Sequence, residues 1–437
     1  MIMKTSYPFL ILSAVFFLSL TATGQKTVMK PKLAHKIKTD TRLITVSEEA
    51  RKLVSSGFNA GDGYSEVWIR DLKTFTELAT KVADKEKLKE ALLTFFKFQG
   101  KDGNIMDGYT EIKNANSGGV FYYSKLAPEF AAHKNTVETD QETSLIQALY
   151  KYIKATGDRS ILKEKIDNST VEERMGKALN FLLEHRFDKK YGLLWGATTV
   201  DWGDVQPEHD WGVVIDSSSH FAIDIYDNAM FVIALTNYID LLELDNQKKP
   251  WQQIKEKIAS NTKKYLWDKK NNKYRTHIYL QDSPFPPDFN ENKIYYHGGT
   301  SIAIEAGLLN KKQVKQAYEK MKANVKAAGA QTIGLTLYPV YPNGFFKNKG
   351  MTEYAYQNGG DWTWFGGRMV QQLIHYGLYK EAYEALSPML DRVLLHKGFY
   401  EWWTSGGEPK GSGQFRGSAG VLWSAIEQLN NQASINR

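Results

Sequence analysis

The segment Phe187-Asp-Lys-Lys-Tyr-Gly-Leu193 shows the pattern from which the fold of this chain can be predicted. An aromatic residue closes a helical stretch, polar turn residues follow, and the chain then returns to apolar residues. Three other segments read alike: Phe98-Gln-Gly-Lys-Asp-Gly-Asn-Ile105, Trp267-Asp-Lys-Lys-Asn-Asn-Lys-Tyr274 and Leu395-His-Lys-Gly-Phe-Tyr400. Asp, Asn and Gly are the residues that tight turns favour. We therefore predict a turn at the end of a long helix in each segment, leading into a short hairpin.

Helical periodicity fills the sequence between these turns. Apolar residues recur at i, i+3 and i+4 in twelve stretches, at 46–55, 72–82, 87–98, 138–155, 171–185, 225–244, 251–266, 301–308, 311–327, 364–376, 379–394 and 418–429. Strand-like runs are few and short, such as 273–280. A turn that recurs between helix pairs indicates an array of α-hairpins. Twelve helices in such pairs close into a double ring, an all-α fold with short β-hairpins in its loops; the alternative is an irregular all-α bundle.

The composition excludes several classes of protein. The 437 residues are 42% hydrophobic and 24% charged, which is ordinary for a globular protein. There is no cysteine, so disulfides, thiolate metal sites and cysteine nucleophiles are excluded. The net charge of +7 is spread over 56 basic and 49 acidic residues without long basic runs, so we expect no nucleic-acid partner.

The N-terminus has the features of a targeting segment. Lys4 precedes an apolar run from Pro8 to Leu20, and small residues at 22–24 offer a cleavage site before Gln25. We predict a signal peptide over residues 1–24 and a single catalytic domain over 25–437, in a periplasmic or secreted protein that is free of the membrane once the leader is removed. The alternative is an N-terminal anchor helix, although the run is shorter than the roughly 20 residues that span a bilayer.

Tryptophan is concentrated outside the predicted helix cores. Eight of the 11 tryptophans lie in four windows rich in glycine and carboxylates, at 65–71, 194–211, 357–364 and 400–403. Sugars pack their C–H faces on aromatic rings and need hydrogen-bonding partners for their hydroxyls. One such window is also typical of a packed loop with a helix cap, but four together favour a carbohydrate site with an oligosaccharide or glycoside as substrate.

Glycosidic bond cleavage needs two carboxyl groups, one protonated and one ionised. A neighbouring tryptophan can desolvate a carboxyl group and raise its pKa, as a general acid requires. Carboxylates in this setting are Asp201 and Asp204 on either side of Trp202, Glu208 and Asp210 close behind them, Asp361 before Trp362, and Glu401 between Tyr400 and Trp402.

The order of these motifs resembles the six-hairpin (α/α)6 glycosidases, which include glucoamylase, trehalase and the processing α-glucosidases. Val67-Trp-Ile-Arg-Asp71 is similar to the glucoamylase segment that holds the terminal sugar, so the resemblance implies that Trp68, Arg70 and Asp71 bind sugar at this position. Asp201-Trp-Gly-Asp204 is similar to the Asp-Trp-Asn-Asp segment of the inverting disaccharide phosphorylases, in which the second aspartate is the general acid. The resemblance thus favours Asp204 over Asp201 as the acid.

The C-terminal part of the chain resembles the same superfamily. Tyr400-Glu-Trp402, followed by Gly411-Ser-Gly-Gln-Phe-Arg-Gly417, resembles the processing α-glucosidases, which implies that Glu401 is the general base. Asn358-Gly-Gly-Asp-Trp362 resembles a pocket-lining loop of the superfamily. Trp202, Asn358, Asp361, Trp362 and Trp402 then complete the sugar-binding wall.

The resemblance covers most of the chain at the level of the predicted fold. At the level of residues, only the short motifs match. The mid-chain loop lacks the usual glucoamylase glutamate pair, and Gly203 stands where the phosphorylase segment has asparagine. The identity of the acid is therefore open among Asp204, Asp201 and three further residues, namely Glu208, Asp210 and Glu138.

The resemblance implies an exo-acting, inverting glycoside hydrolase for an α-glycoside. The histidines are scattered without an HxxxH or HxH pair, so we expect no metal and no other cofactor. Three rival functions share the fold: a sugar epimerase, which uses paired histidines; a disaccharide phosphorylase, which needs a phosphate site; and a carbohydrate-binding protein without catalysis.

Overall fold

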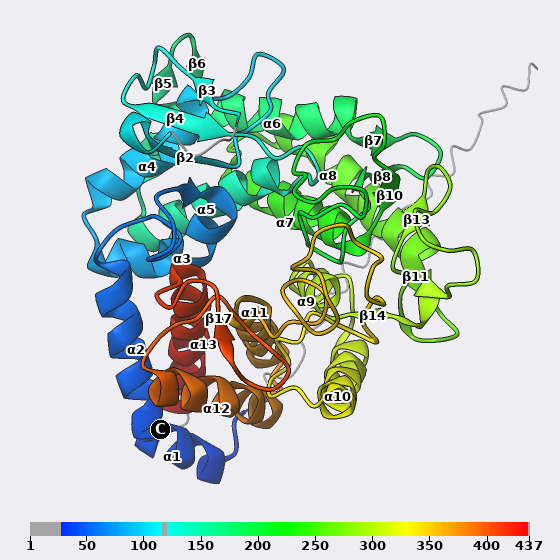
Figure 1. Ribbon diagram of the computed structural model, residues 1–437. Coiled ribbons are helices and arrows are strands. Elements are labelled where there is room, and N and C mark those ends of the chain that lie inside the picture. The colour runs from blue at the N-terminus through cyan, green and yellow to red at the C-terminus, as the bar shows by residue number, and fades with distance from the viewer. Residues whose placement is uncertain (1–27, 116–119, 436–437) are drawn as a thin grey trace, which may run out of the picture.

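The computed structural model describes residues 28–115 and 120–435, which form a ring of helices (Figure 1). The signal peptide predicted for residues 1–24 lies outside the described residues. In the described part of the chain no helix is both long and apolar enough to span a membrane.

Six helices build the inner ring of the described chain. They are α3 (Ile69–Val82), α5 (Asp140–Thr156), α7 (Ile225–Leu241), α9 (His297–Glu305), α11 (Thr363–His375) and α13 (Arg416–Ser434). Each packs on the next in this order, and α13 packs back on α3, so the ring is closed (Figure 1).

An outer layer surrounds this ring. It consists of α2 (Thr41–Val54), α4 (Lys85–Lys97), α6 (Val171–His185), α8 (Asp245–Asn261), α10 (Lys311–Ala328) and α12 (Tyr379–His396). Each outer helix packs on the inner helix that precedes or follows it in the chain, and α2 packs on α13 as well as on α3. A further short helix, α1 (Pro31–Thr39), lies against α13. The arrangement is an (α/α)6 toroid, as the sequence predicted.

Residue pattern explains which helices lie inside. Helix α7 is apolar on every face and buries residues all around its first three turns, whereas its neighbour α8 buries only Ile258 among its described residues. A helix that is hydrophobic all round must be enclosed by other elements, and one with a single apolar stripe covers them from outside. The alternation of the two types along the chain therefore builds two concentric layers.

Short strands occupy the loops at the ends of the helices. The largest sheet has the order β1-β2-β4-β3, formed by Val67–Trp68, Gly108–Glu111, Phe130–His133 and Tyr122–Tyr123. A second sheet joins β13 (Ile278–Tyr279), β10 (Phe221–Ile223) and β9 (Gly196–Ala197). The remaining strands form two-stranded hairpins or pairs: β5 (Lys165–Ile166) with β6 (Ser169–Thr170), β7 (Phe187–Asp188) with β8 (Leu193–Leu194), β11 (Trp267–Asp268) with β12 (Lys273–Tyr274), β14 (Tyr295–Tyr296) with β15 (Leu337–Tyr338), and β16 (Trp402–Trp403) with β17 (Pro409–Lys410).

The predicted helices are all present, with ends shifted by a few residues. Helix α1 is the one that periodicity missed, because it is short and mostly polar. Of the four turn segments, those at 187–193 and 267–274 form the expected hairpins. The turn at 395–400 follows the end of α12 at His396, where Lys397 adopts a left-handed conformation, and leads into the β16–β17 hairpin, as expected. The turn at 98–105 is closed by a hydrogen bond from the Gly100 N–H to the Asn104 carbonyl and leads into β2 of the largest sheet instead of a short hairpin.

Candidate active site

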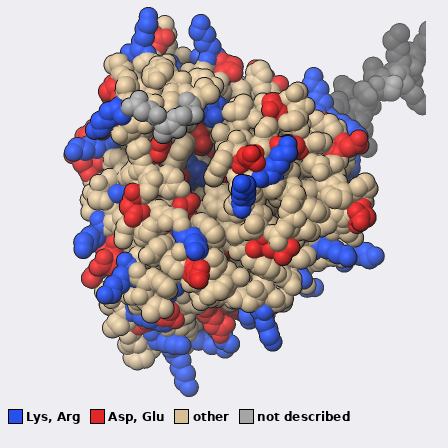
Figure 2. All heavy atoms as spheres, viewed as in Figure 1, with Lys and Arg blue, Asp and Glu red and all other residues tan. Residues whose placement is uncertain are grey.

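Two connected cavities lie at the end of the ring where the inner helices begin. The inner chamber has a volume of about 430 Å³ and the outer chamber about 750 Å³. They share four lining residues, Tyr64, Trp211, Tyr356 and Glu401, so the outer chamber opens into the inner one. Figure 2 shows this face of the molecule hollowed over the centre of the ring.

Glu401 stands at the boundary between the chambers, held by a turn and a tyrosine. Its carboxylate accepts hydrogen bonds from the Ser412 N–H (3.1 Å) and the Tyr64 hydroxyl (3.0 Å). Gly411 has φ 69°, and a Cβ there would lie 2.3 Å from the Glu401 Oε2 atom, so only glycine fits beside this carboxylate. Burial raises the pKa of Glu401, and the charge of Asp204 adds to the effect.

Asp204 lines the inner chamber from the mid-chain loop. Its Oδ1 atom accepts a hydrogen bond of 2.7 Å from the Gln357 side-chain amide. Because Asp204 and Glu401 both line the inner chamber, the fold brings together the two carboxylates that the sequence singled out.

Arg70 forms part of the chamber floor and is fixed from behind by two carboxylates. Its guanidinium pairs with Glu138 and, at 2.7 Å, with Asp140, which also accepts a 2.7 Å hydrogen bond from the Tyr226 hydroxyl. The guanidinium carbon lies 5.9 Å from the centre of the Trp202 ring. These contacts fix the Arg70 guanidinium at the start of α3, where Arg70 lines the inner chamber.

Two further carboxyl groups line the inner chamber. Burial raises the pKa of Asp71 to about 8 and that of Asp107 to about 7, in both cases against the opposing effect of Arg70. A carboxyl group that keeps its proton near neutral pH donates one hydrogen bond and accepts others, which suits sugar hydroxyls.

The tryptophans form the walls. Among the eight from the four sequence windows, six line the described chambers: Trp68, Trp202, Trp211, Trp362, Trp364 and Trp402. Trp202 packs against Trp362 and Trp364 with ring centres 4.8 and 5.6 Å apart. The other two serve packing, since Trp195 lies over Arg186 and Trp403 over Arg392.

Three of the predicted site residues do not line either described chamber. Asp201 is buried with φ 57° and accepts a 2.7 Å hydrogen bond from the Gly299 N–H, which anchors the start of α9. Asn358 is enclosed and bonds to the backbone of Tyr341 on both sides. Asp361 is paired with Arg392 at 3.0 Å.

The remaining predicted residues fall in or near the site. Trp402 lines the outer chamber, not the inner one, and Trp68, Arg70, Asp71, Trp202 and Trp362 line the inner chamber. Of the alternative acids, Asp210 lines the outer chamber, Glu208 is bound to His220 at 2.6 Å, and Glu138 is paired with Arg70. Among these acids, Asp204 alone lines the inner chamber that Glu401 also lines.

Sequence reasoning missed four residues at the site: Tyr64, Asp107, Tyr356 and Gln357. Tyr356 has φ 46°, unusual for an aromatic residue and a form of backbone strain that is common at functional sites. Its carbonyl accepts hydrogen bonds from the Trp362 indole (2.9 Å) and the Gly360 N–H (3.1 Å). The sequence feature that could have indicated this strained loop is the run of Tyr, Asn and Gly at 354–360.

Within residues 28–115 and 120–435, no three His, Cys, Asp or Glu side chains are grouped so as to hold a metal ion. His133 is the single histidine among the described residues that line the inner chamber, and burial lowers its pKa.

The fold, the paired carboxylates and the indole walls together define a glycosidase. A family model, the catalytic domain of the glycosyl hydrolase 94 superfamily, matches residues 42–364. The chain belongs to this superfamily. The matched range contains Asp204 and ends before Glu401.

Solved structures share the fold. An uncharacterised conserved protein from Thermus thermophilus has a TM-score of 0.61 at 16% identity, covering 89% of this chain and 99% of that chain. The GH63 mannosylglycerate hydrolase from the same organism, in complex with glucose, has a TM-score of 0.60 at 15% identity, with coverage of 89% and 99%. A rhamnosidase from Klebsiella oxytoca with rhamnose bound has a TM-score of 0.58 at 13% identity, with coverage of 88% and 63%. A comparison with curated proteins found no match.

Proposed function

We propose that this chain is an exported, exo-acting glycoside hydrolase that cleaves an α-glycosidic bond with inversion, using Asp204 as general acid and Glu401 as general base. The observation that carries the proposal is the presence of both carboxylates in one chamber with Arg70 and the indole walls. The carbohydrate class of the substrate follows from the superfamily.

The reaction balances with these two groups. Asp204 gives its proton to the glycosidic oxygen as the bond between this oxygen and the anomeric carbon breaks. Glu401 takes a proton from a water molecule as the water oxygen bonds to the anomeric carbon from the opposite side. The enzyme ends with Asp204 ionised and Glu401 protonated, and one proton exchanged with solvent restores the starting state.

Exo action agrees with the shape of the site. The inner chamber is about 430 Å³, at the small end of the range for ligand pockets, and Arg70, Trp202 and Trp362 line it. We therefore assign it to one terminal sugar ring. The outer chamber then holds the leaving part of the substrate.

Glu401 favours hydrolysis over phosphorolysis. A phosphorylase places a phosphate anion where a hydrolase has its base and its water. Glu401 is buried, and the two groups that hydrogen-bond to its carboxylate in the described chain, the Ser412 N–H and the Tyr64 hydroxyl, carry no positive charge, so a phosphate beside it would be repelled. Release of free sugar at an unchanged rate when phosphate is added supports hydrolysis; a phosphate-dependent sugar phosphate product would show the opposite.

The experiment uses the mature chain, a panel of α- and β-linked oligosaccharides, and proton NMR of the product as it forms. We expect one terminal sugar to be released from an α-glycoside as its β-anomer. Glu401→Gln and Asp204→Asn are each expected to abolish most of the turnover. Glu408→Gln, on the same hairpin but exposed and paired with Lys410, is the matched control.

Export is tested separately. Expression of the full-length chain in a bacterium with a periplasm, followed by N-terminal sequencing, is expected to give a protein that begins near Gln25. A chain that keeps residues 1–24 would contradict the proposal.

A further inference from the structure

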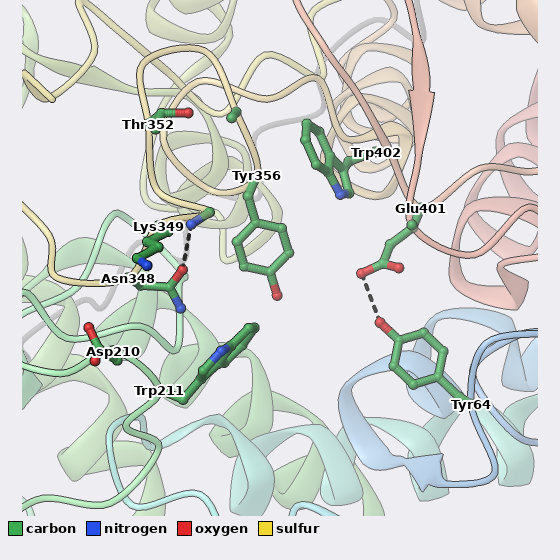
Figure 3. A pocket seen from close by; sticks show the side chains of 12 residues that line it. Tyr64, Asp210, Trp211, Asn348, Lys349, Thr352, Tyr356, Glu401 and Trp402 are labelled. Carbon is green, nitrogen blue, oxygen red and sulfur yellow. Dashed lines mark hydrogen bonds between the residues drawn. The ribbon is translucent and has the colours of Figure 1, made fainter.

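Tyr356 stands where the two chambers meet, as one of the four residues that line both of them. Under the proposed function this boundary is the place of the scissile bond, because the terminal sugar lies in the inner chamber and the leaving part in the outer one. Figure 3 shows the Tyr356 hydroxyl directed into the space between Trp211 and the hydrogen-bonded pair of Tyr64 and Glu401. The side chain therefore brings a polar group to the place where the bond is broken.

The ring of Tyr356 is held in one position by its own backbone and by two indoles. Its carbonyl accepts hydrogen bonds from the Trp362 indole (2.9 Å) and the Gly360 N–H (3.1 Å). A Cβ atom at position 360 would clash with this carbonyl oxygen, so only glycine fits there. The ring packs against Trp362 and Trp402, with ring centres 5.5 and 6.1 Å apart. A side chain fixed in this way presents its hydroxyl in one direction.

The Tyr356 hydroxyl is a donor that a substrate can reach. Among the described residues it has no hydrogen-bond partner, and it is not one of the unpartnered polar atoms that are sealed from solvent. Burial raises the pKa of Tyr356, and the charges of Asp204 and Glu401 raise this pKa further. The hydroxyl therefore keeps its proton and donates a hydrogen bond to an acceptor that enters the chambers.

The position of Asp204 indicates which substrate atom the hydroxyl meets. The next residue after Tyr356, Gln357, donates a 2.7 Å hydrogen bond to Asp204 Oδ1, so one loop carries both the hydroxyl and the amide that holds the proposed acid. Among the charges that raise the pKa of Tyr356, that of Asp204 has the largest effect. An acid must lie beside the oxygen that it protonates. A hydroxyl close to Asp204, at the boundary of the chambers, therefore faces the glycosidic oxygen.

We propose that Tyr356 is a further catalytic residue, whose hydroxyl donates a hydrogen bond to the glycosidic oxygen and stabilises the negative charge that develops there. The proposal rests on the function proposed above. No proton leaves the tyrosine. The electron pair of the broken bond stays on the glycosidic oxygen, Asp204 gives its proton to this oxygen, and the alcohol departs neutral. A donor that is already fixed toward the developing charge needs no reorganisation during the reaction.

The test compares leaving groups that need this donor with leaving groups that do not. The variant is Tyr356→Phe, which removes the hydroxyl and keeps the ring. The substrates are the p-nitrophenyl α-glycosides of glucose, mannose and rhamnose, and α-linked disaccharides of the same sugars. The p-nitrophenolate anion is stable and leaves without a donor, whereas a sugar alkoxide is not stable. Tyr354→Phe is the matched control, because Tyr354 lies on the same loop with a φ of 60° and lines neither described chamber.

We expect Tyr356→Phe to lower kcat/KM for the disaccharide by about tenfold to a hundredfold, the loss that follows when one neutral donor to a developing charge is removed. The value for the p-nitrophenyl glycoside should change by less than about threefold. Both limbs of the pH profile should keep their positions, because Asp204 and Glu401 remain. The melting temperature should stay that of the wild type, since the hydroxyl has no partner in the described chain. Tyr354→Phe should leave both kinetic values unchanged.

The outcomes separate this inference from the proposed function. If Tyr356→Phe lowers kcat/KM for both kinds of substrate equally, or for neither, the hydroxyl does not act on the leaving oxygen, while the hydrolase assignment stands. A shift of the alkaline limb in Tyr356→Phe would also overturn the inference, because it would place the hydroxyl on Asp204 and not on the substrate. If the wild-type protein hydrolyses none of the probes, the proposed function fails, and this inference fails with it.

Discussion

Replacing Glu401 by glutamine removes the proposed base while leaving its surroundings almost intact. The carboxylate accepts from the Ser412 N–H and from the Tyr64 hydroxyl. The glutamine carbonyl can keep the first bond, and the Tyr64 hydroxyl can accept from the new amide, because a hydroxyl both donates and accepts. The free energy of unfolding should therefore change by less than about 1 kcal/mol.

The effect on activity is much larger. A positioned general base contributes about 10²–10⁴-fold, which is about 2.7–5.4 kcal/mol of transition-state stabilisation at 1.36 kcal/mol per decade. We expect kcat of Glu401→Gln to fall by this factor, with a melting temperature close to that of the wild type. The measurement is steady-state kinetics on the substrate found in the glycan panel, together with thermal denaturation.

The pH profile gives a second readout of the same residue. Burial raises the pKa of Glu401, and a base must be ionised, so wild-type kcat/KM should fall on the acidic side through this raised pKa, at a higher pH than an ordinary glutamate would give. Glutamine at position 401 cannot ionise, so the residual activity of Glu401→Gln should lose this acidic limb.

Either of two results would contradict the role of Glu401 as the base. One is a Glu401→Gln variant that keeps more than about a tenth of the wild-type kcat. The other is a variant that loses the alkaline limb of the profile and keeps the acidic limb, because this would make Glu401 the acid.

Three further predictions address the surroundings of the two carboxylates. Gln357→Leu removes the amide that holds Asp204 and should lower kcat by about tenfold with little change in KM, measured by steady-state kinetics; an unchanged kcat would show that this hydrogen bond does not position the acid. Asp201→Ala leaves the Gly299 N–H unpaired and should cost about 1–3 kcal/mol in chemical denaturation, while kcat below the transition stays near wild type; a stable but inactive variant would give Asp201 a role in the chemistry. Asp107 has its pKa raised from 3.8 to about 7, so the folded state binds its proton more tightly than the unfolded state does, and its contribution to stability is lost as pH rises through about 7. Asp107→Asn cannot ionise and should lose less stability than the wild type as the pH is raised from about 5 to about 8 in denaturation experiments; equal losses would contradict the raised pKa.

The limits of sequence reasoning are clearest in the loop at 354–362. The sequence marked Asn358 and Asp361 as pocket residues and passed over Tyr356 and Gln357. In the structure Tyr356 and Gly359 have positive φ values of 46° and 88°, and Tyr356 and Gln357 line the inner chamber. Asn358 instead bonds to the backbone of a neighbouring loop. A backbone reversal of this kind changes which side chains face a cavity without changing the order of the residues.

The mid-chain carboxylates show the same limit. Asp201 and Asp204 both flank Trp202 in sequence, and local context barely separates them. Asp201 has a left-handed backbone and binds the start of α9, so it is committed to the fold, whereas Asp204 is held by Gln357 at the chamber wall. The resemblance to the phosphorylase segment favoured Asp204, and the structure is consistent with that choice through contacts from segments far away in the chain.

The layered ring of helices could be predicted from the residues alone, because hydrophobic periodicity is a local property and the recurring turns pair each helix with the next. The sequence also shows that tryptophan, aspartate and glutamate residues gather in the loops between the predicted helices. Which of these side chains share a chamber depends on the packed molecule. Ring closure brings α13 against α3 and sets Glu401 beside Tyr64. These two residues come from opposite ends of the chain, so their contact depends on the packing of all six inner helices.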